Sequence, residues 1–89
     1  MDSLNAISFV KRGKNRKKIF LALDKPMMPS ELVMKIYKSN SNTYFNLVSR
    51  ALSELREKKF VEVVNPKEKT GRIYRRTKEG EKVVRELKD

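Results

Sequence analysis

The sequence predicts a small α+β fold that is mostly helical and contains one β-hairpin. Apolar residues recur at helical spacing in five segments, around residues 4–10, 15–23, 30–38, 43–59 and 77–87. Two short segments, 60–64 and 72–76, are typical of strands and flank a loop of turn-forming residues. The chain has 89 residues, 38% of them apolar, and no internal repeat or linker. We therefore expect one domain over residues 1–89, with an N-terminal extension and short helix at 1–13 and the core fold at 14–87.

Three helices are expected in the first part of the chain, each ended by a helix breaker or a polar turn. Their apolar stripes are Leu4, Ile7 and Val10, then Ile19, Phe20 and Leu23, then Leu32, Val33, Ile36 and Tyr37. Gly13 follows the first helix, and Pro26 and Pro29 stop the second. Ser30 is well placed to cap the third, with Glu31 favourable in its first turn, and this helix should end near Lys38.

The next helix, from about Thr43 to Lys59, is the most informative segment. The polar residues from Ser39 to Thr43 favour a turn, so a helix-turn-helix geometry is expected here. The apolar stripe expected in the core comprises Phe45, Val48, Leu52, Leu55 and the aliphatic stem of Lys59. The opposite side of the first three turns is polar and lacks carboxylates, and comprises Asn42, Thr43, Asn46, Ser49, Arg50 and Ser53. Asn and Arg can read base edges and Ser and Thr can reach phosphates, so this side suits a DNA major groove. A surface helix that merely lacks early acids explains the pattern nearly as well.

A β-hairpin with a cationic tip is expected after this helix. Strands at Phe60–Val64 and Arg72–Arg76 flank a loop that carries Lys67 and Lys69. The residues expected to face the core are Ile73 and either Val61 or Val63. Thr77 can then cap a last helix, whose apolar residues are Val83, Val84 and Leu87.

The net charge of the chain is +11, and two segments carry all of it. Residues 11–18 contain six basic residues and no acid, and residues 65–78 contain six basic residues against Glu68 alone. A positive charge this concentrated favours a polyanionic partner, above all a nucleic acid. A solvated basic face is the alternative explanation.

Several classes of function are disfavoured by residues that the chain lacks. Without cysteine or histidine, disulfides, thiolate chemistry, most zinc sites and histidine-based catalysis are excluded. No carboxylate pair, Gly-rich phosphate loop or activated nucleophile is evident, so we expect no enzyme activity, cofactor or metal. The apolar run from Ile19 to Leu23 is too short for a membrane span or a signal peptide. We expect a cytoplasmic, nucleoid-associated protein without membrane contact.

Three strings, in this order, carry a family resemblance. They are Val48-Ser49-Arg50-Ala51-Leu52, then Leu55 with Glu57-Lys58-Lys59-Phe60-Val61-Glu62, and finally Gly71-Arg72-Ile73-Tyr74-Arg75-Arg76-Thr77-Lys78-Glu79-Gly80. Over about Lys14 to Leu87 the chain resembles the MarR-like winged helix-turn-helix transcriptional regulators, especially small archaeal members. The resemblance implies a winged helix-turn-helix with a two- or three-stranded β-wing that binds specific double-stranded DNA.

The resemblance also implies which residues meet the DNA. On the recognition helix these include Asn46, Ser49 and Arg50, among the polar residues given above, while Leu47 meets a thymine methyl or, as the better reading, packs on the second helix. The wing residues are Lys67, Lys69, Arg72 and Arg75, although Arg72 could instead pair with a carboxylate to hold the hairpin. The cations proposed for additional phosphate contacts are Lys14, Arg16 and Lys17.

The chain departs from the family pattern at the start of the recognition helix. The preceding turn, Tyr37 to Ser41, is about five residues longer than in the family and has no glycine, and Tyr44 stands where the family favours a capping Ser. Thr43, Asn42 or Ser41 could cap the helix instead.

Family members usually dimerise through terminal helices, which nominates a homodimer surface of Leu4, Ile7, Val10, Val83, Val84 and Leu87. An equally good reading is that these residues close the core of a single copy. Two rivals to a specific regulator remain open: a non-specific architectural DNA-binding protein and a winged-helix protein-interaction module.

Overall fold

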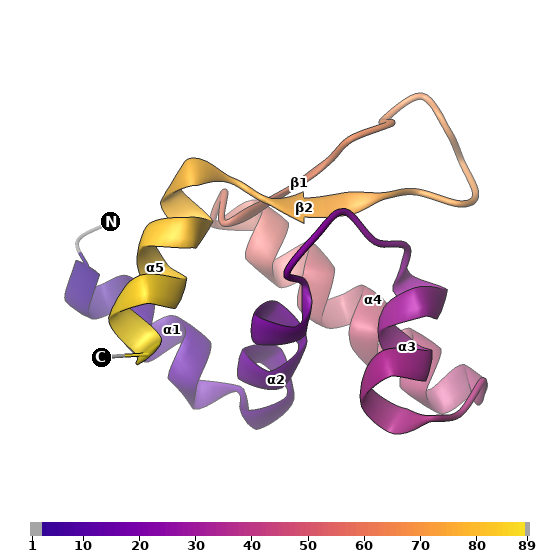
Figure 1. Cartoon of the computed structure of the whole chain (residues 1–89), viewed down its shortest axis with the longest axis horizontal. Coiled ribbons are helices and arrows are strands. Elements are labelled where there is room, and N and C mark those ends of the chain that lie inside the picture. Colours follow the sequence, from indigo (N-terminus) through magenta and orange to yellow (C-terminus); the bar gives the residue numbers. More distant parts are fainter. Residues whose placement is uncertain (1–2, 89) are drawn as a thin grey trace.

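The computed structural model describes residues 3–88, without the side chains of Ser3, Leu4 and Lys88. Within this range the chain forms five helices and one antiparallel pair of strands (Figure 1). The elements in order are α1 (Ser3–Arg12), α2 (Lys14–Ala22), α3 (Pro29–Tyr37), α4 (Asn42–Glu57), β1 (Val61–Val63), β2 (Tyr74–Arg76) and α5 (Lys78–Lys88). The predicted α+β class, mostly helical with one hairpin, is confirmed. No helix of the described part is both long and apolar enough to cross a membrane.

The core lies where α2, α3 and α4 meet, and α1 and α5 extend it at one end of the molecule. The buried residues at the centre are Ile19, Phe20, Leu32, Val33, Val48, Ala51, Leu52 and Leu55. At the α1 and α5 end, Val10 packs into the same cluster as Val83 and Val84. Each helix therefore buries or half-buries the described residues of its predicted stripe, with two exceptions on α4.

Phe45 and Lys59 were expected in the core, and the structure corrects both. Phe45 is 42% exposed because it lies in the first turns of α4, at the edge of the apolar arc. Lys59 is exposed because α4 ends at Glu57 and Lys59 takes a positive φ of 65° in the turn that follows. The core-facing side of α4 thus begins one turn later and ends one turn earlier than expected.

The two strands pair over three residues each, with Val61 opposite Arg76, Glu62 opposite Arg75 and Val63 opposite Tyr74. Met27 adds a single bridge to Tyr74 through backbone hydrogen bonds of 2.9 and 2.8 Å. Because side chains alternate along a strand, Tyr74 is buried with Val61, and Ile73 is only half-buried. The prediction that Ile73 faces the core was wrong, whereas that for Val61 is confirmed.

The cap of α3 differs from the expected one, and the structure decides between the three residues that could cap α4. Met28, not Ser30, precedes α3, and its backbone N–H donates to the carboxylate of Glu31 at 2.9 Å. Ser41 caps α4, since its hydroxyl accepts from the N–H of Thr43 at 3.2 Å. Thr77 caps α5 as predicted, because its hydroxyl accepts from the N–H of Gly80 at 3.0 Å.

Candidate nucleic-acid interface

The polar side of α4 is presented to solvent at one end of the molecule. Asn42, Thr43, Asn46, Arg50 and Ser53 are exposed, and Ser49 is half-buried. Within the described chain, the side chains of Asn46, Arg50 and Ser53 have no hydrogen-bond or ion-pair partner. No acidic residue occurs between Glu31 and Glu54, so the first three turns of α4 are free of carboxylates. These donors are therefore available to an external acceptor.

The start of α4 is held in place by contacts with α3. The rings of Tyr37 and Tyr44 are stacked, with centroids 4.3 Å apart and planes 7° from parallel. Burial, together with the neighbouring Tyr44, raises the pKa of the Tyr37 hydroxyl above its usual value. The intervening turn needs no glycine because Lys38 itself adopts the left-handed conformation, with φ at 54°. Together with the Ser41 cap, these contacts fix how α4 begins.

The hairpin loop, residues 64–73, is braced by side chains that bond to its backbone. Asn65 accepts from the N–H of Ile73 at 2.7 Å and donates to the carbonyl of Gly71 at 3.2 Å. Arg72 donates from Nε to the carbonyl of Glu68 at 2.8 Å. This brace leaves Lys67 and Lys69 exposed and without an ion-pair partner in the part of the chain that the structure describes.

Two arginines of the hairpin have internal partners. The alternative prediction for Arg72 was that it holds the hairpin by pairing with a carboxylate. Arg72 does brace the hairpin, but it bonds to a backbone carbonyl and not to a carboxylate. Arg75, expected at the DNA, pairs with Glu62 on the opposite strand at 2.8 Å. Arg72 is half-buried and Arg75 is exposed. Glu62 offsets the charge of Arg75, whereas no carboxylate of the described chain offsets that of Arg72.

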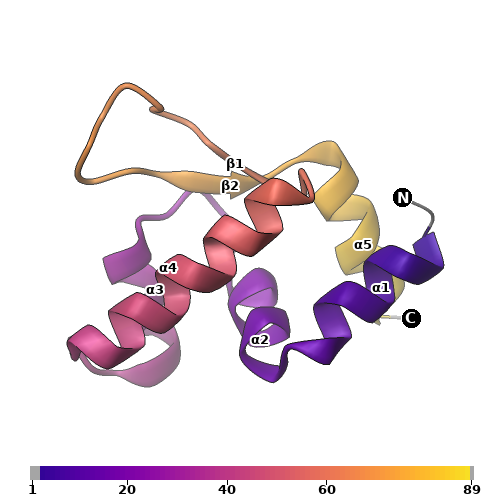
Figure 2. The ribbon, with the colours of Figure 1, turned by 180° about the vertical axis from the view of Figure 1, so that it is seen from behind.

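A groove separates the hairpin loop from the starts of α3 and α4. Its volume is about 390 Å³, and its walls are residues 28–30, Phe45, Ser49, residues 69–72 and Tyr74. Figures 1 and 2 show the loop and the N-terminal half of α4 at the same end of the molecule, away from α1 and α5. The walls contain two cations, Lys69 and Arg72, and no carboxylate. The structure thus brings together Ser49 of α4 and the loop cations, which are separated by 20 or more residues in sequence.

Of the three cations expected on α2, the structure removes one from the surface. The Arg16 side chain is only 17% exposed and pairs with Glu54 of α4 at 3.2 Å. Its guanidinium also lies 4.1 Å from the ring centroid of Phe9 and donates to the Phe9 carbonyl. Lys14 is exposed and Lys17 half-buried, and neither has an ion-pair partner among the described residues. Arg16 is therefore corrected from a phosphate ligand to a link between α1, α2 and α4.

The residues nominated for a homodimer surface lie largely inside one copy. Val10 is fully buried, and Val83 and Val84 are each 4% exposed. Ile7 and Leu87 are half-buried, and the side chain of Leu4 lies outside the described residues. A second copy could therefore contact only the edge of this set, and closure of the monomer's own core accounts for most of it.

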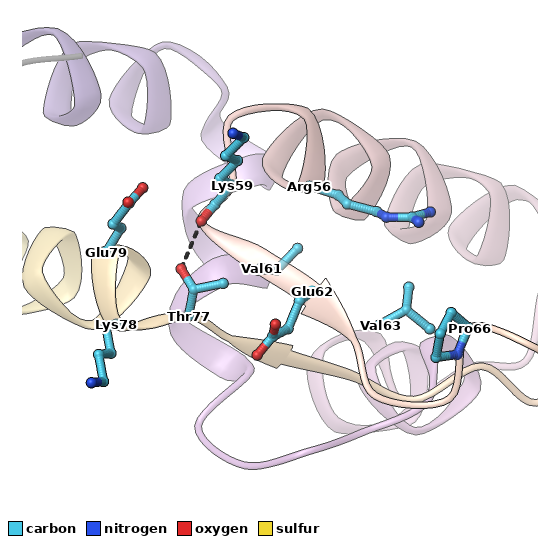
Figure 3. A pocket seen from close by; sticks show the side chains of 9 residues that line it. All are labelled: Arg56, Lys59, Val61, Glu62, Val63, Pro66, Thr77, Lys78 and Glu79. Carbon is cyan, nitrogen blue, oxygen red and sulfur yellow. Dashed lines mark hydrogen bonds between the residues drawn. The ribbon is translucent and has the colours of Figure 1, made fainter.

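A second concavity, of about 550 Å³, lies at the far end of α4, beside β1 and the start of α5. Its lining mixes both charge signs: Arg56, Lys59 and Lys78 with Glu62 and Glu79. Figure 3 shows these side chains pointing in different directions, and shows the hydroxyl of Thr77 donating to the carbonyl of Lys59. A polyanion is better matched by the acid-free groove at the other end.

Sequence reasoning missed two residues that shape the interface, and the internal contacts of a third residue, Arg76, which does not line the groove. Phe45 lines the groove, Asn65 braces the loop, and Arg76, with its side chain 7% exposed, donates to the carbonyl of Leu23. An Asn that follows a strand directly and precedes proline is a recognisable turn signal. Nothing in the sequence reveals the partners of Arg76, because Leu23 lies 53 residues away.

Comparison with known protein families, with curated proteins and with solved structures finds no match to this chain. The candidate interface therefore stands on the charges, exposures and contacts described above.

Proposed function

We propose that this chain is a sequence-specific, double-stranded DNA-binding transcriptional regulator of the winged helix-turn-helix type. In this proposal α3 and α4 form the helix-turn-helix, α4 is the recognition helix in the major groove, and the hairpin is the wing. The observation that carries the proposal is the exposed, carboxylate-free polar side of α4, at the same end as the hairpin loop, whose Lys67 and Lys69 have no ion-pair partner among the described residues.

Affinity and specificity would come from different groups. The cations Lys14, Lys17, Lys67 and Lys69 would neutralise phosphates and release counterions, which favours any duplex. Asn46 and Arg50, whose side chains have no internal partner in the described chain, would read base edges. An asparagine side chain can form two hydrogen bonds with adenine, and an arginine side chain can form two with guanine.

The test is a selection followed by a binding titration. Duplexes are selected from a randomised pool, and their affinity is compared with that of a scrambled duplex by fluorescence anisotropy at about 50 and 200 mM salt. We expect a preference for the selected duplex that persists at the higher salt. Arg50→Ala should weaken binding to that duplex by about 1–3 kcal/mol and weaken binding to the scrambled duplex only slightly.

Arg85→Ala is the matched control, because Arg85 is an exposed arginine on α5, away from the candidate interface. It removes the same charge and should weaken both duplexes slightly and equally. Loss of affinity at 200 mM that is equal for every duplex would instead support a non-specific architectural protein. No duplex binding at either salt would support a winged-helix module for an acidic protein partner.

A further inference from the structure

Phe45 is an exposed aromatic residue in the wall of a groove that mixes apolar and cationic side chains. It lies at the end of the first turn of α4, is 42% exposed, and forms part of the wall of the groove beside Ser49, Lys69 and Arg72. A phenyl ring in this position leaves apolar surface in contact with water, which favours its burial against another apolar group. The core does not take the ring in, because the buried side of α4 begins at Val48.

We propose that Phe45 is a specificity-determining residue that contacts the C5-methyl group of a pyrimidine in the major groove. This inference rests on the function proposed above. The C5-methyl group is the apolar group that a base pair presents in the major groove, and a phenyl ring is one of its recognised partners. The N-terminal turns of a recognition helix are the part that reaches base edges.

The charge around Phe45 favours a nucleic acid over an uncharged apolar partner, although Met28, Pro29 and Tyr74 also line the groove. Lys69 and Arg72 flank the groove, no carboxylate lines it, and Ser49 lies one helical turn from Phe45 on the same wall. The two cations, both on the hairpin loop, suit phosphates next to the base. The Ser49 hydroxyl can donate to O4 of thymine or accept from N4 of cytosine, so the site fits thymine and 5-methylcytosine alike.

Leu47 was the residue that the sequence offered for a thymine methyl. It is half-buried and does not line the groove. Phe45 presents more apolar surface at a position that faces the loop cations, so the methyl-reading role moves to Phe45.

The experiment uses duplexes selected with the wild-type chain. Each thymine is replaced singly by deoxyuridine, which removes only the methyl group, and each cytosine is replaced singly by 5-methylcytosine, which adds it. We expect the wild type to bind about fourfold more weakly when uracil replaces thymine at one or two positions. A gain of similar size with 5-methylcytosine would identify the methyl group, whichever base carries it, as the group recognised.

Phe45→Ala should bind the thymine and uracil duplexes equally, and Phe45→Leu should retain part of the discrimination. Met34→Ala is the control for loss of an exposed apolar side chain, because Met34 is 53% exposed and does not line the groove. It should discriminate as the wild type does. Thermal unfolding followed by circular dichroism establishes that all three variants are folded.

Two results would overturn the inference alone: wild-type binding that ignores the methyl group at every position, or undiminished discrimination by Phe45→Ala. Failure to enrich or bind any duplex would overturn the proposed function, and this inference with it.

Discussion

Single residues fasten the last helix to the end of α4. The backbone N–H of Thr77 donates to the carbonyl of Phe60 at 3.0 Å, and its hydroxyl donates to the carbonyl of Lys59 at 2.6 Å. Gly80 then packs so closely on Phe60 that a Cβ at this position would lie 2.1 Å from the Phe60 carbonyl oxygen. Thr77 and Gly80, three residues apart, therefore both contribute to packing the start of α5 against the end of α4.

Replacing Gly80 with alanine should destabilise the fold. Alanine is favoured over glycine in a helix by about 1 kcal/mol, but here its methyl group meets a backbone oxygen that cannot rotate away. We expect a net loss of about 1–3 kcal/mol in the free energy of unfolding, measured by urea titration. Lys82→Ala, at an exposed position of α5, should stay within about 0.5 kcal/mol. A Gly80→Ala variant as stable as the wild type would refute the steric argument.

Residues whose partners are distant in sequence are those that the sequence could not place. Arg16 belongs to a run of cations, and only the fold reveals that Glu54, 38 residues away, pairs with it. Phe45 fits the apolar arc of α4 by angle, but at that level a groove separates the helix from α3 and the hairpin loop, which leaves the ring 42% exposed. By contrast, Thr77 as a cap and Val48, Leu52 and Leu55 as core residues follow from local chemistry and helical period, and were predicted correctly.

At the scale of elements, the helices were predictable and the hairpin only in outline. Five apolar stripes gave five helices with boundaries a few residues from those observed. The strands are shorter than expected because the side chain of Asn65 takes the N–H of Ile73, which ends regular pairing there. The side chains of Asn65 and Arg72 brace the loop beyond the strands. Lys67 and Lys69, which are exposed and have no partner among the described residues, therefore lie on a braced segment.

Removing those lysines should weaken DNA binding without regard to sequence. Lys67 and Lys69 are exposed and have no partner in the described chain, and they lie on the hairpin loop and not on the recognition helix, so we expect each to contact a phosphate. We expect Lys67→Ala combined with Lys69→Ala to lower affinity for selected and scrambled duplexes by the same factor. The slope of log affinity against log salt should fall in magnitude by about 2.

The double variant Lys82→Ala and Arg85→Ala is a suitable control, since it removes two exposed charges from α5 at the other end of the molecule. It should leave the salt slope nearly unchanged. A loss confined to the selected duplex would show instead that the hairpin loop reads bases.

At the scale of the whole molecule, the fold decides how much of the +11 charge can act on a polyanion. Arg16 and Arg75 each pair with a glutamate, and Arg76 is buried against Leu23 and lies 3.6 Å from Glu81. Among the candidate contacts, six have no carboxylate partner in the described chain: Arg50, which is assigned to a base edge, and Lys14, Lys17, Lys67, Lys69 and Arg72, which can each neutralise a phosphate. These cations lie on α2, α4 and the hairpin loop, and none of them is a residue of α5.

This reduced set predicts the salt dependence of binding. If one copy neutralises about five phosphates, log affinity should fall with log salt at a slope of about −4 to −5, and two copies on one site should give about twice that. Sedimentation of the protein–duplex complex at the same salt concentrations gives the number of copies bound. A slope of about −4 to −5 with one copy per duplex would agree with a core closed within the monomer by Val10, Val83 and Val84. A slope near −9 with a single copy bound would contradict the assignment, because about five further cations outside the candidate interface would then have to contact phosphates.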